Sequence, residues 1–312
     1  MLTTLLALLP IILITALGYL LERTGLISRD QWRGIERLAY FLLFPAILFK
    51  SIATVDFNAV PTLEMGLALL CAILVMVGGV LALRPWMQAR FNINGPRFTS
   101  IFQGAVRWNG FLALAMADSL MGSEGVALLA VAMVVMIPVL NISSILVLSK
   151  YGDSGVTPTP AKVARDLYTN PFNIAIAAGI VFNLLSIPIP GFALQTLTML
   201  GAASLPVGII CVGASLDLNS LRRPGPALTL GTFIRLLVSP LMGAAFAFAF
   251  GVTGNAHTAI IIACSVPSAS NAFLLARLMG GDTKLMAEIL TLQTLVAIAT
   301  IPLAILLLDS AS

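Results

Sequence analysis

Charged residues are scarce in this sequence, and so are the side chains from which catalytic and metal sites are usually built. Only 10% of the 312 residues are Asp, Glu, Lys or Arg, while 59% are hydrophobic; an ordinary soluble domain has roughly 25% charged residues. This balance excludes a soluble globule, because most of the chain must face lipid or other apolar helices. The 17 Lys and Arg residues only slightly outnumber the 13 Asp and Glu residues, and no nucleic-acid partner is expected.

Cysteine and histidine are rare as well. Cys71, Cys211 and Cys264 lie in apolar stretches without metal-ligand spacing, and we interpret them as packing residues. The single histidine, His257, falls at the predicted outer edge of a span, where we expect an interfacial role. An intramembrane serine protease would need a base near a serine such as Ser215, and the histidine is predicted at the opposite face. The sequence therefore predicts no metal, no cofactor and no enzyme.

Long hydrophobic runs are what the sequence has in abundance. Helical runs of about 17 to 25 apolar residues can cross ~30 Å of hydrocarbon, and a helix satisfies its own backbone groups there. Ten such candidates are present: Thr4–Leu21, Leu38–Ala53, Met65–Leu83, Phe98–Leu120, Val126–Leu148, Phe172–Ile187, Leu194–Leu216, Ala227–Val252, Thr258–Met279 and Ile289–Leu308. We therefore predict an all-α integral membrane protein of ten transmembrane helices.

The basic residues alternate between the connections of these spans. Of the 17 Lys and Arg residues, 14 lie in the odd-numbered connections: Arg23, Arg29, Arg33, Arg37, Arg84, Arg90, Arg97, Lys150, Lys162, Arg165, Arg222, Arg223, Arg277 and Lys284. The positive-inside rule places these connections in the cytoplasm. We therefore expect a multi-pass protein of the inner (plasma) membrane with both termini periplasmic.

The two halves of the chain share a pattern of prolines, glycines and polar residues. At a shift of 161 residues the matches are Pro10 with Pro171, Gly18 with Gly179, and Pro45 with Pro206. Residues 109–112, Asn-Gly-Phe-Leu, correspond to residues 271–274, Asn-Ala-Phe-Leu. The pattern predicts two five-helix repeats, 1–148 and 167–312, joined by a cytoplasmic linker at 149–166. Because five is odd, the second repeat must be inverted in the membrane, as in many secondary transporters.

Two polar interruptions lie at matching positions of the repeats, at 104–110 in the fourth span and at 265–271 in the ninth. Helix-breaking and hydrogen-bonding residues near mid-span are typical of discontinuous helices that line a substrate cavity. Close helix packing by small residues is the alternative interpretation of either interruption alone. The candidate substrate-binding residues are Arg107, Asn109, Gly110, Pro267, Ser268, Ser270 and Asn271.

Two arginines lie inside spans. Arg107 falls about ten residues into the fourth span, near the bilayer midplane at ~1.5 Å per residue, where a cation needs a partner. That partner is either a carboxylate substrate, which a guanidinium binds bidentately, or a group of the protein. Arg235 is nearer the cytoplasmic side of the eighth span, where it could snorkel, and we expect a structural role for it. Gln293 and Thr294 in the tenth span are expected to bond neighbouring helices.

These features together resemble the auxin efflux carrier family over essentially the whole chain. The resemblance is carried by the ten-span inverted repeat, by Arg-x-Asn-Gly-Phe at 107–111 and by Ser-Val-Pro-Ser-Ala-Ser-Asn at 265–271. It implies a fold similar to the bile acid sodium symporters, in which spans one, two, six and seven form a scaffold and the others a transport domain that moves as an elevator. It also implies a substrate site where the fourth and ninth helices cross, at Asn109, Gly110, Pro267 and Asn271.

The resemblance implies secondary transport of small organic anions. Bacterial relatives are associated with malate, malonate and similar carboxylates, and auxin-like anions are the other candidates. A sodium-coupled carrier of the bile acid type is the alternative, and a coupling ion, sodium or proton, is left open; the interruptions hold no carboxylate for proton antiport. The expected partners are the anion and the lipid bilayer, with a homodimer through the scaffold helices as a further candidate.

Overall fold

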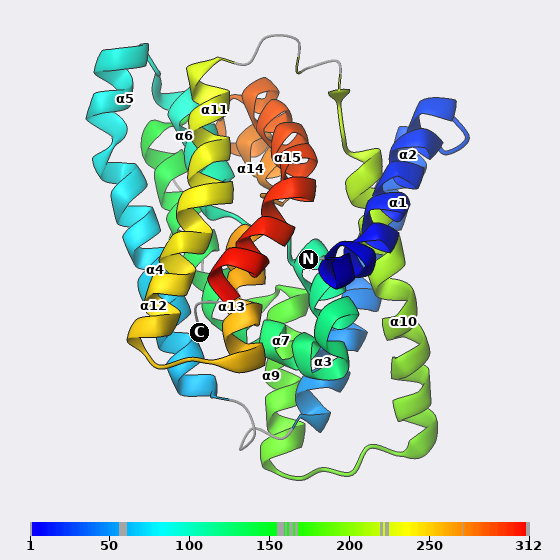
Figure 1. Ribbon diagram of the computed structural model, residues 1–312. Coiled ribbons are helices and arrows are strands. Elements are labelled where there is room, and N and C mark those ends of the chain that lie inside the picture. The colour runs from blue at the N-terminus through cyan, green and yellow to red at the C-terminus, as the bar shows by residue number, and fades with distance from the viewer. Residues whose placement is uncertain are drawn as a thin grey trace. The chain divides into compact units, whose positions relative to one another are not determined.

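The computed structural model describes residues 2–55, 61–154, 159, 161, 165, 168–218, 221, 225–269 and 271–309. Regular structure in this part of the chain is entirely helical, and Figure 1 shows how the helices follow one another along the chain. Each predicted span falls on helix. Six helices are long and apolar enough to cross a membrane: Asp30–Thr54, Thr62–Phe91, Gly95–Tyr151, Gly191–Ala214, Pro226–Ala249 and Thr283–Leu308. The integral membrane class is thereby supported, while the count of ten and the inverted repeat stay predictions.

The chain divides into two compact units. Unit 1 comprises residues 1–62, 111–134 and 164–215. Its helices, apart from the first limb of α7, are α1 (Leu2–Thr24), α2 (Arg29–Leu38), η1 (Ala39–Leu43), α3 (Phe44–Thr54), α9 (Pro171–Leu184) and α10 (Gly191–Ala214). Within it α3 packs on α9 and α1 packs on α10. The Phe44 ring stacks on Phe111 with the centroids 3.9 Å apart, which joins α3 to the start of α7.

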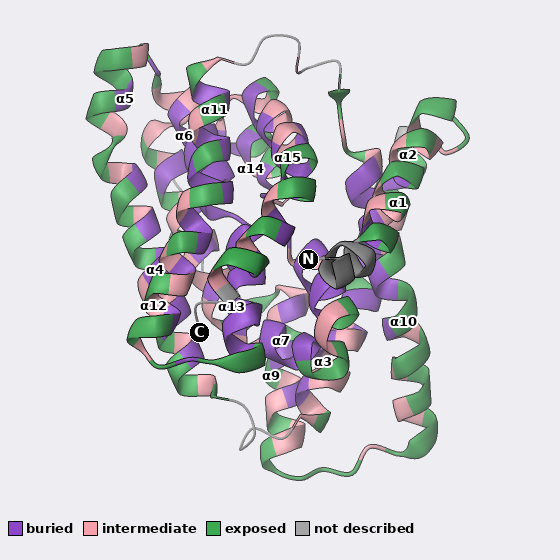
Figure 2. Cartoon of the chain, in the orientation of Figure 1, coloured by how far each residue is buried: buried purple, intermediate pink, exposed green. Residues whose placement is uncertain are grey.

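Unit 2 comprises residues 63–110, 135–163 and 216–312. Its helices, apart from the second limb of α7, are α4 (Thr62–Ala82), α5 (Arg84–Phe91), α6 (Gly95–Val106), α11 (Pro226–Phe233), η3 (Ile234–Val238), α12 (Ser239–Ala249), α13 (Gly254–Ser265), α14 (Asn271–Met279) and α15 (Thr283–Asp309). The centre of the unit is α13, which is buried from Ala256 to Ser265 and packs on α12 and α15 (Figure 2). A helix that is apolar and buried on all sides is expected at the core of a bundle.

The long helix α7 (Gly110–Tyr151) contributes to both units. Gly122, with φ 60° and ψ −144°, interrupts the helix, and a backbone conformation of this kind favours glycine because it has no Cβ. The turn falls between Leu120 and Val126, where the sequence predicted the end of the fourth span and the start of the fifth.

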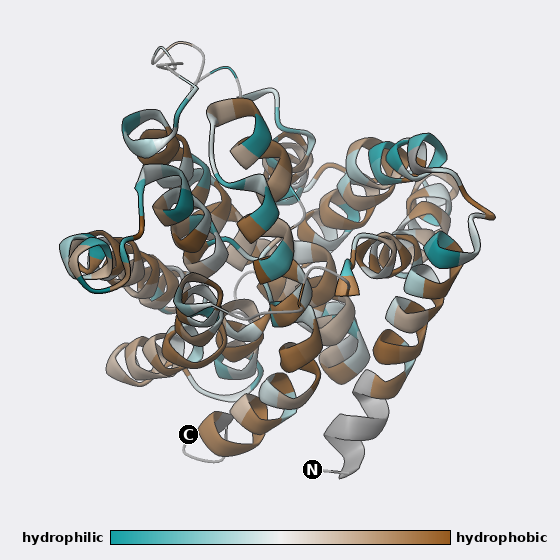
Figure 3. Ribbon diagram, turned by 90° about the horizontal axis from the view of Figure 1, so that it is seen from above, coloured by the Kyte–Doolittle hydropathy of each residue, from teal (hydrophilic) through white to brown (hydrophobic). Residues whose placement is uncertain are grey.

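Many large apolar side chains are exposed on the outside of the helices. Phe192 and Met199 on α10 are 77% and 69% exposed, and Phe248 on α12 is 80% exposed. Figure 3 shows long hydrophobic stretches along the helices, with hydrophilic residues more frequent in the connections. In water such surfaces would be a liability, whereas in a bilayer they face lipid tails.

Two π-helical turns, η1 and η3, each lie just before a proline, Pro45 and Pro240. Proline lacks an N–H group, and its ring clashes with the carbonyl four residues earlier in a regular helix. The wider turn relieves that clash, and the residue before each proline bonds five residues back: in η3 the Ser239 N–H donates to the Ile234 carbonyl. Turns of this kind often occur at functional sites, and η3 carries Arg235.

Candidate functional site

Two helical segments of unit 2 are interrupted at the polar stretches seen in the sequence. Residues 107–109 separate α6 from α7, and Arg107 is extended, with φ −70° and ψ 155°. In the second half of the chain α13 ends at Ser265, Val266 is extended with φ −65° and ψ 148°, and α14 begins at Asn271. Both predicted discontinuities are therefore present, and the residues that follow the two helix ends have nearly the same backbone angles.

The residue types account for these breaks locally. Pro267 has no N–H group and disfavours helical angles at Val266 before it, so α13 cannot continue. Asn109 directly precedes α7, a position at which an asparagine side chain is favoured because its oxygen can accept from the first backbone N–H groups. Local residue preferences are therefore enough to explain why the helices are interrupted at both places.

The two breaks contact each other directly. The Asn109 N–H donates to the Pro267 carbonyl at 2.8 Å, which joins the two interrupted backbones. The Arg107 guanidinium donates through Nη2 to Asn271 Oδ1 at 3.0 Å. Arg107 and Asn109 are buried, whereas Asn271 is exposed. The sequence left two kinds of partner open for Arg107, a carboxylate substrate or a group of the protein. Asn271 is a partner of the second kind.

Side chains from neighbouring helices satisfy the carbonyl groups at the end of α6. The Gln293 side chain on α15 donates to the Gly104 carbonyl at 2.8 Å and to the Gly231 carbonyl at 3.1 Å, and it accepts from the Ser268 N–H at 2.8 Å. The Ser268 hydroxyl donates to the Gln103 carbonyl at 3.2 Å. The expected interhelical role of Gln293 is thus confirmed, and the residue links α6, α11 and α15 at the break.

Arg235 is placed differently from the expectation. Snorkelling towards the cytoplasm is wrong, because only 2% of the residue is exposed. Its Nε donates to the Val266 carbonyl and its Nη2 to the Ala263 carbonyl, both at 2.7 Å, and Nη1 donates to the Ser239 hydroxyl at 3.3 Å. The reason is the unpaired carbonyl groups at the end of α13, which give the guanidinium hydrogen-bond partners inside the bundle in place of water at the membrane surface.

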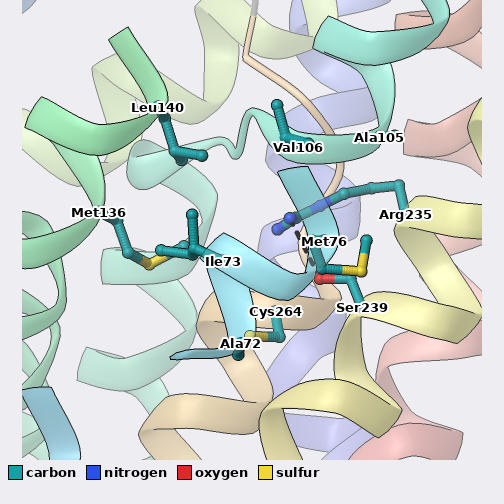
Figure 4. Close-up of a pocket in the computed structure, with 10 residues that line it drawn as sticks. All are labelled: Ala72, Ile73, Met76, Ala105, Val106, Met136, Leu140, Arg235, Ser239 and Cys264. Atoms are coloured by element: carbon teal, nitrogen blue, oxygen red, sulfur yellow. Dashed lines mark hydrogen bonds between the residues drawn. The ribbon is translucent and has the colours of Figure 1, made fainter. Parts of the chain in front are cut away.

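A small cavity adjoins this arginine. Its volume is about 10 Å³, about the minimum for one water molecule. Figure 4 shows its lining residues, which are Ala72, Ile73, Met76, Ala105, Val106, Met136, Leu140, Arg235, Ser239 and Cys264. In this conformation the cavity is too small for an organic anion.

Most of the predicted site residues lie at or beside the two breaks. Hydrogen bonds join Arg107 to Asn271 and Asn109 to Pro267, while Ser268 bonds Gln103 and Gln293. Gly110 begins α7 and is half-buried, and Ser270 lies outside the described residues. A part in substrate binding stays a prediction for all of them. His257, expected at an interface, is instead 3% exposed within α13.

Sequence reasoning missed Arg235 as a member of this cluster. The signal was available, since a charged residue within an apolar span marks a functional or structural partner by default. Its partners are backbone carbonyl groups, however, and no sequence pattern names those. In the described part of the chain, no three His, Cys, Asp or Glu side chains are grouped so that they could hold a metal ion.

Comparison with known proteins gives matches over nearly the whole chain. A family described as "Membrane transport protein" matches residues 3–305. A protein of Methanothermobacter thermautotrophicus, described as an uncharacterized transporter, is 25% identical over 295 residues, which cover 95% of this chain and 95% of the relative. Both matches include the two breaks and the helices that hold them. The chain therefore belongs to the membrane transport protein family, which is the auxin efflux carrier family that its motifs resemble.

Proposed function

We propose that this transporter carries small organic anions, auxin-like molecules or dicarboxylates such as malate and malonate, by elevator-type alternating access. The observation that carries the proposal is the pair of touching helix breaks with a buried arginine at their contact. A guanidinium stays protonated in proteins, and its planar pair of N–H donors matches a carboxylate bidentately. An anion is the ligand that such a charge favours.

The polarity of the half-helices supports the same class of substrate. Protein side chains cap carbonyl groups at the C-terminal ends of α6 and α13, through Gln293 and Arg235. The N-terminal ends of α7 and α14, which begin at Gly110 and Asn271, carry the positive ends of their helix dipoles. Anions bind preferentially at such ends, so a carboxylate beside Arg107 would meet three favourable charges.

The division of the chain supports movement of one part against another. An elevator needs a compact moving unit, and unit 2 contains both breaks together with the helices that cap them. The helices that hold spans one, two, six and seven, our expected scaffold, lie in unit 1, and so do residues 111–134 of α7, which we expect in the transport domain. Rigid-body motion of one unit past another is an established way of alternating access.

Transport by purified protein tests the proposal. We expect proteoliposomes to accumulate radiolabelled malate, malonate or indole acetate, and an Asn109→Ala variant that inserts normally to lose this uptake. Gradients of sodium and of protons, applied separately, would distinguish a uniporter from a proton-coupled carrier and from the sodium-coupled bile acid type. Failure of the wild type to transport malate, malonate and indole acetate, while a bile acid or a cation is carried, would overturn the proposed substrate class.

A further inference from the structure

The C-terminal end of α13 presents an electrostatic problem that the chain must solve. The last carbonyl groups of a helix have no partner within the helix, and together they carry a partial negative charge. Every residue from Ala256 to Ser265 is buried, so bulk water does not reach this end. Hydrogen-bond donors must therefore be supplied at the break, and a positive group is favoured there by the partial negative charge.

Arg235 supplies that group. Its Nε and Nη2 atoms donate to the Val266 and Ala263 carbonyls, the two that flank the end of α13. No carboxylate of the described residues lies within 4.0 Å of the guanidinium, and the arginine is 2% exposed. The charge is thus balanced by backbone carbonyl groups and one hydroxyl, which are the kinds of oxygen ligand that a small cation takes.

The surrounding helix holds the guanidinium in place. Arg235 lies in the π-helical turn η3, which Pro240 enforces, and Ser239 at the end of that turn accepts from Nη1 at 3.3 Å. Figure 4 shows the side chain reaching toward Ser239 and Cys264, with mostly apolar residues around the adjoining cavity. The arginine is therefore a fixed part of unit 2.

The geometry points to Arg235 as a resident cation, that is, a positive charge supplied by the protein itself, at the break between α13 and α14. We propose that its guanidinium occupies the position at the end of α13 that a monovalent coupling cation would otherwise take, and so holds Val266 and Pro267 against Asn109. The inference rests on the proposed function, because it explains how the anion site is positioned without sodium at this place. Arg235 is thus a positioning residue that acts through the 266–269 backbone.

The test uses the full-length protein in detergent and needs no substrate. We expect Arg235→Ala to melt several degrees below the wild type, and millimolar methylguanidinium to restore much of that loss by filling the vacated position. The matched control is Arg277→Ala, which removes an exposed arginine from α14; methylguanidinium should leave its melting temperature unchanged. Equal responses of the two variants, or no response of Arg235→Ala, would overturn the proposal.

Two further measurements decide the matter if Arg235→Ala cannot be purified. The melting temperature of the wild type should be the same in sodium, potassium and choline chloride, and a rise specific to sodium would contradict a resident cation. Arg235→Lys, which keeps a charge, should fold and bind malonate less tightly than the wild type, equally so in sodium and in choline. Malonate binding by Arg235→Lys that requires sodium would overturn the inference.

The same experiments separate this inference from the proposed function. If no variant and no wild-type sample binds malonate, malate or indole acetate, the proposed substrate class fails. Methylguanidinium rescue of the empty carrier would still stand in that case, because melting is measured without any anion. Conversely, sodium-dependent anion uptake by the wild type would leave the substrate class intact and remove Arg235 from this role.

Discussion

At the scale of single residues, Arg107 is the position where the sequence left two partners open. The structure gives it a neutral partner, Asn271 Oδ1, at 3.0 Å. A neutral partner is compatible with an anion as a second one, since a guanidinium offers five N–H donors. The bond to Asn271 would then orient the Arg107 guanidinium toward the substrate and leave other N–H donors for it.

Substitution of Arg107 separates substrate binding from a purely structural role. We expect Arg107→Lys to weaken carboxylate binding about ten-fold or more, equivalent to about 1 to 2 kcal/mol, because an ammonium group lacks the planar two-donor fork. Arg107→Gln should lose more, because it also removes the charge. Dissociation constants on monodisperse protein, beside melting temperatures of the empty carrier, provide the measurement.

A purely structural role of Arg107 predicts a different result for the same two variants. A structural arginine would make both variants melt lower without substrate, while their folded fraction binds the anion normally. Asn271→Ala is the informative companion, since it removes only the amide that holds Nη2. Normal affinity in folded Arg107→Gln would leave the half-helix N-termini as the main anion donors.

At the scale of the elements, the α1 and α10 helices of unit 1 pack with almost no space between their backbones. A Cβ placed on Gly213 would overlap the Thr15 carbonyl, and one placed on Gly18 would overlap the Ile210 carbonyl. Backbone atoms cannot move aside as a side chain end can. Small residues that let helices approach closely are a usual means of association in membranes, where lipid tails are as apolar as leucine.

A glycine-to-alanine pair tests this crossing. Gly213→Ala should destabilise the protein by roughly 1 to 3 kcal/mol, seen as a melting temperature several degrees lower. Gly78→Ala on α4 is the matched control, because nothing lies within 4 Å of its added Cβ; alanine there should be neutral or favourable by up to about 1 kcal/mol. Similar melting temperatures for the two variants would show that the helices separate easily.

The breaks show how far sequence reasoning reaches at this scale. Pro267 predicted where α13 stops and Asn109 where α7 begins, because each acts on the backbone next to it. The capping of those ends was harder to predict, because Gln293 and Arg235 donate to carbonyl groups that every residue possesses. Only the folded arrangement selects which carbonyl a side chain reaches.

At the scale of the whole molecule, the distribution of basic residues makes a prediction about topology. Both termini should be periplasmic and the odd-numbered connections cytoplasmic, because most Lys and Arg residues lie in those connections. In a chain with its three cysteines replaced, Gln88→Cys should be protected from a membrane-impermeant maleimide in intact cells. Thr253→Cys should be labelled, and a phosphatase fused to the C-terminus should be active.

One outcome would contradict this arrangement clearly. Labelling of Gln88→Cys but not of Thr253→Cys in intact cells would invert the whole topology. An inactive C-terminal phosphatase together with the expected labelling at both cysteines would instead mean that one of the last two spans does not cross, and the count of ten would be wrong.

The sequence by itself determined that the protein lies in a lipid bilayer, that it is helical, and where its two interrupted helices break. These properties follow from composition, from the length of apolar runs and from residues that act on their own backbone, so they are local. The tertiary structure decided which groups meet: Arg107 with Asn271, Asn109 with Pro267, and Arg235 with the end of α13. Contacts between segments more than a hundred residues apart, or with a backbone carbonyl, leave no pattern in one sequence. They depend on how the packed helices bring those atoms within hydrogen-bonding distance.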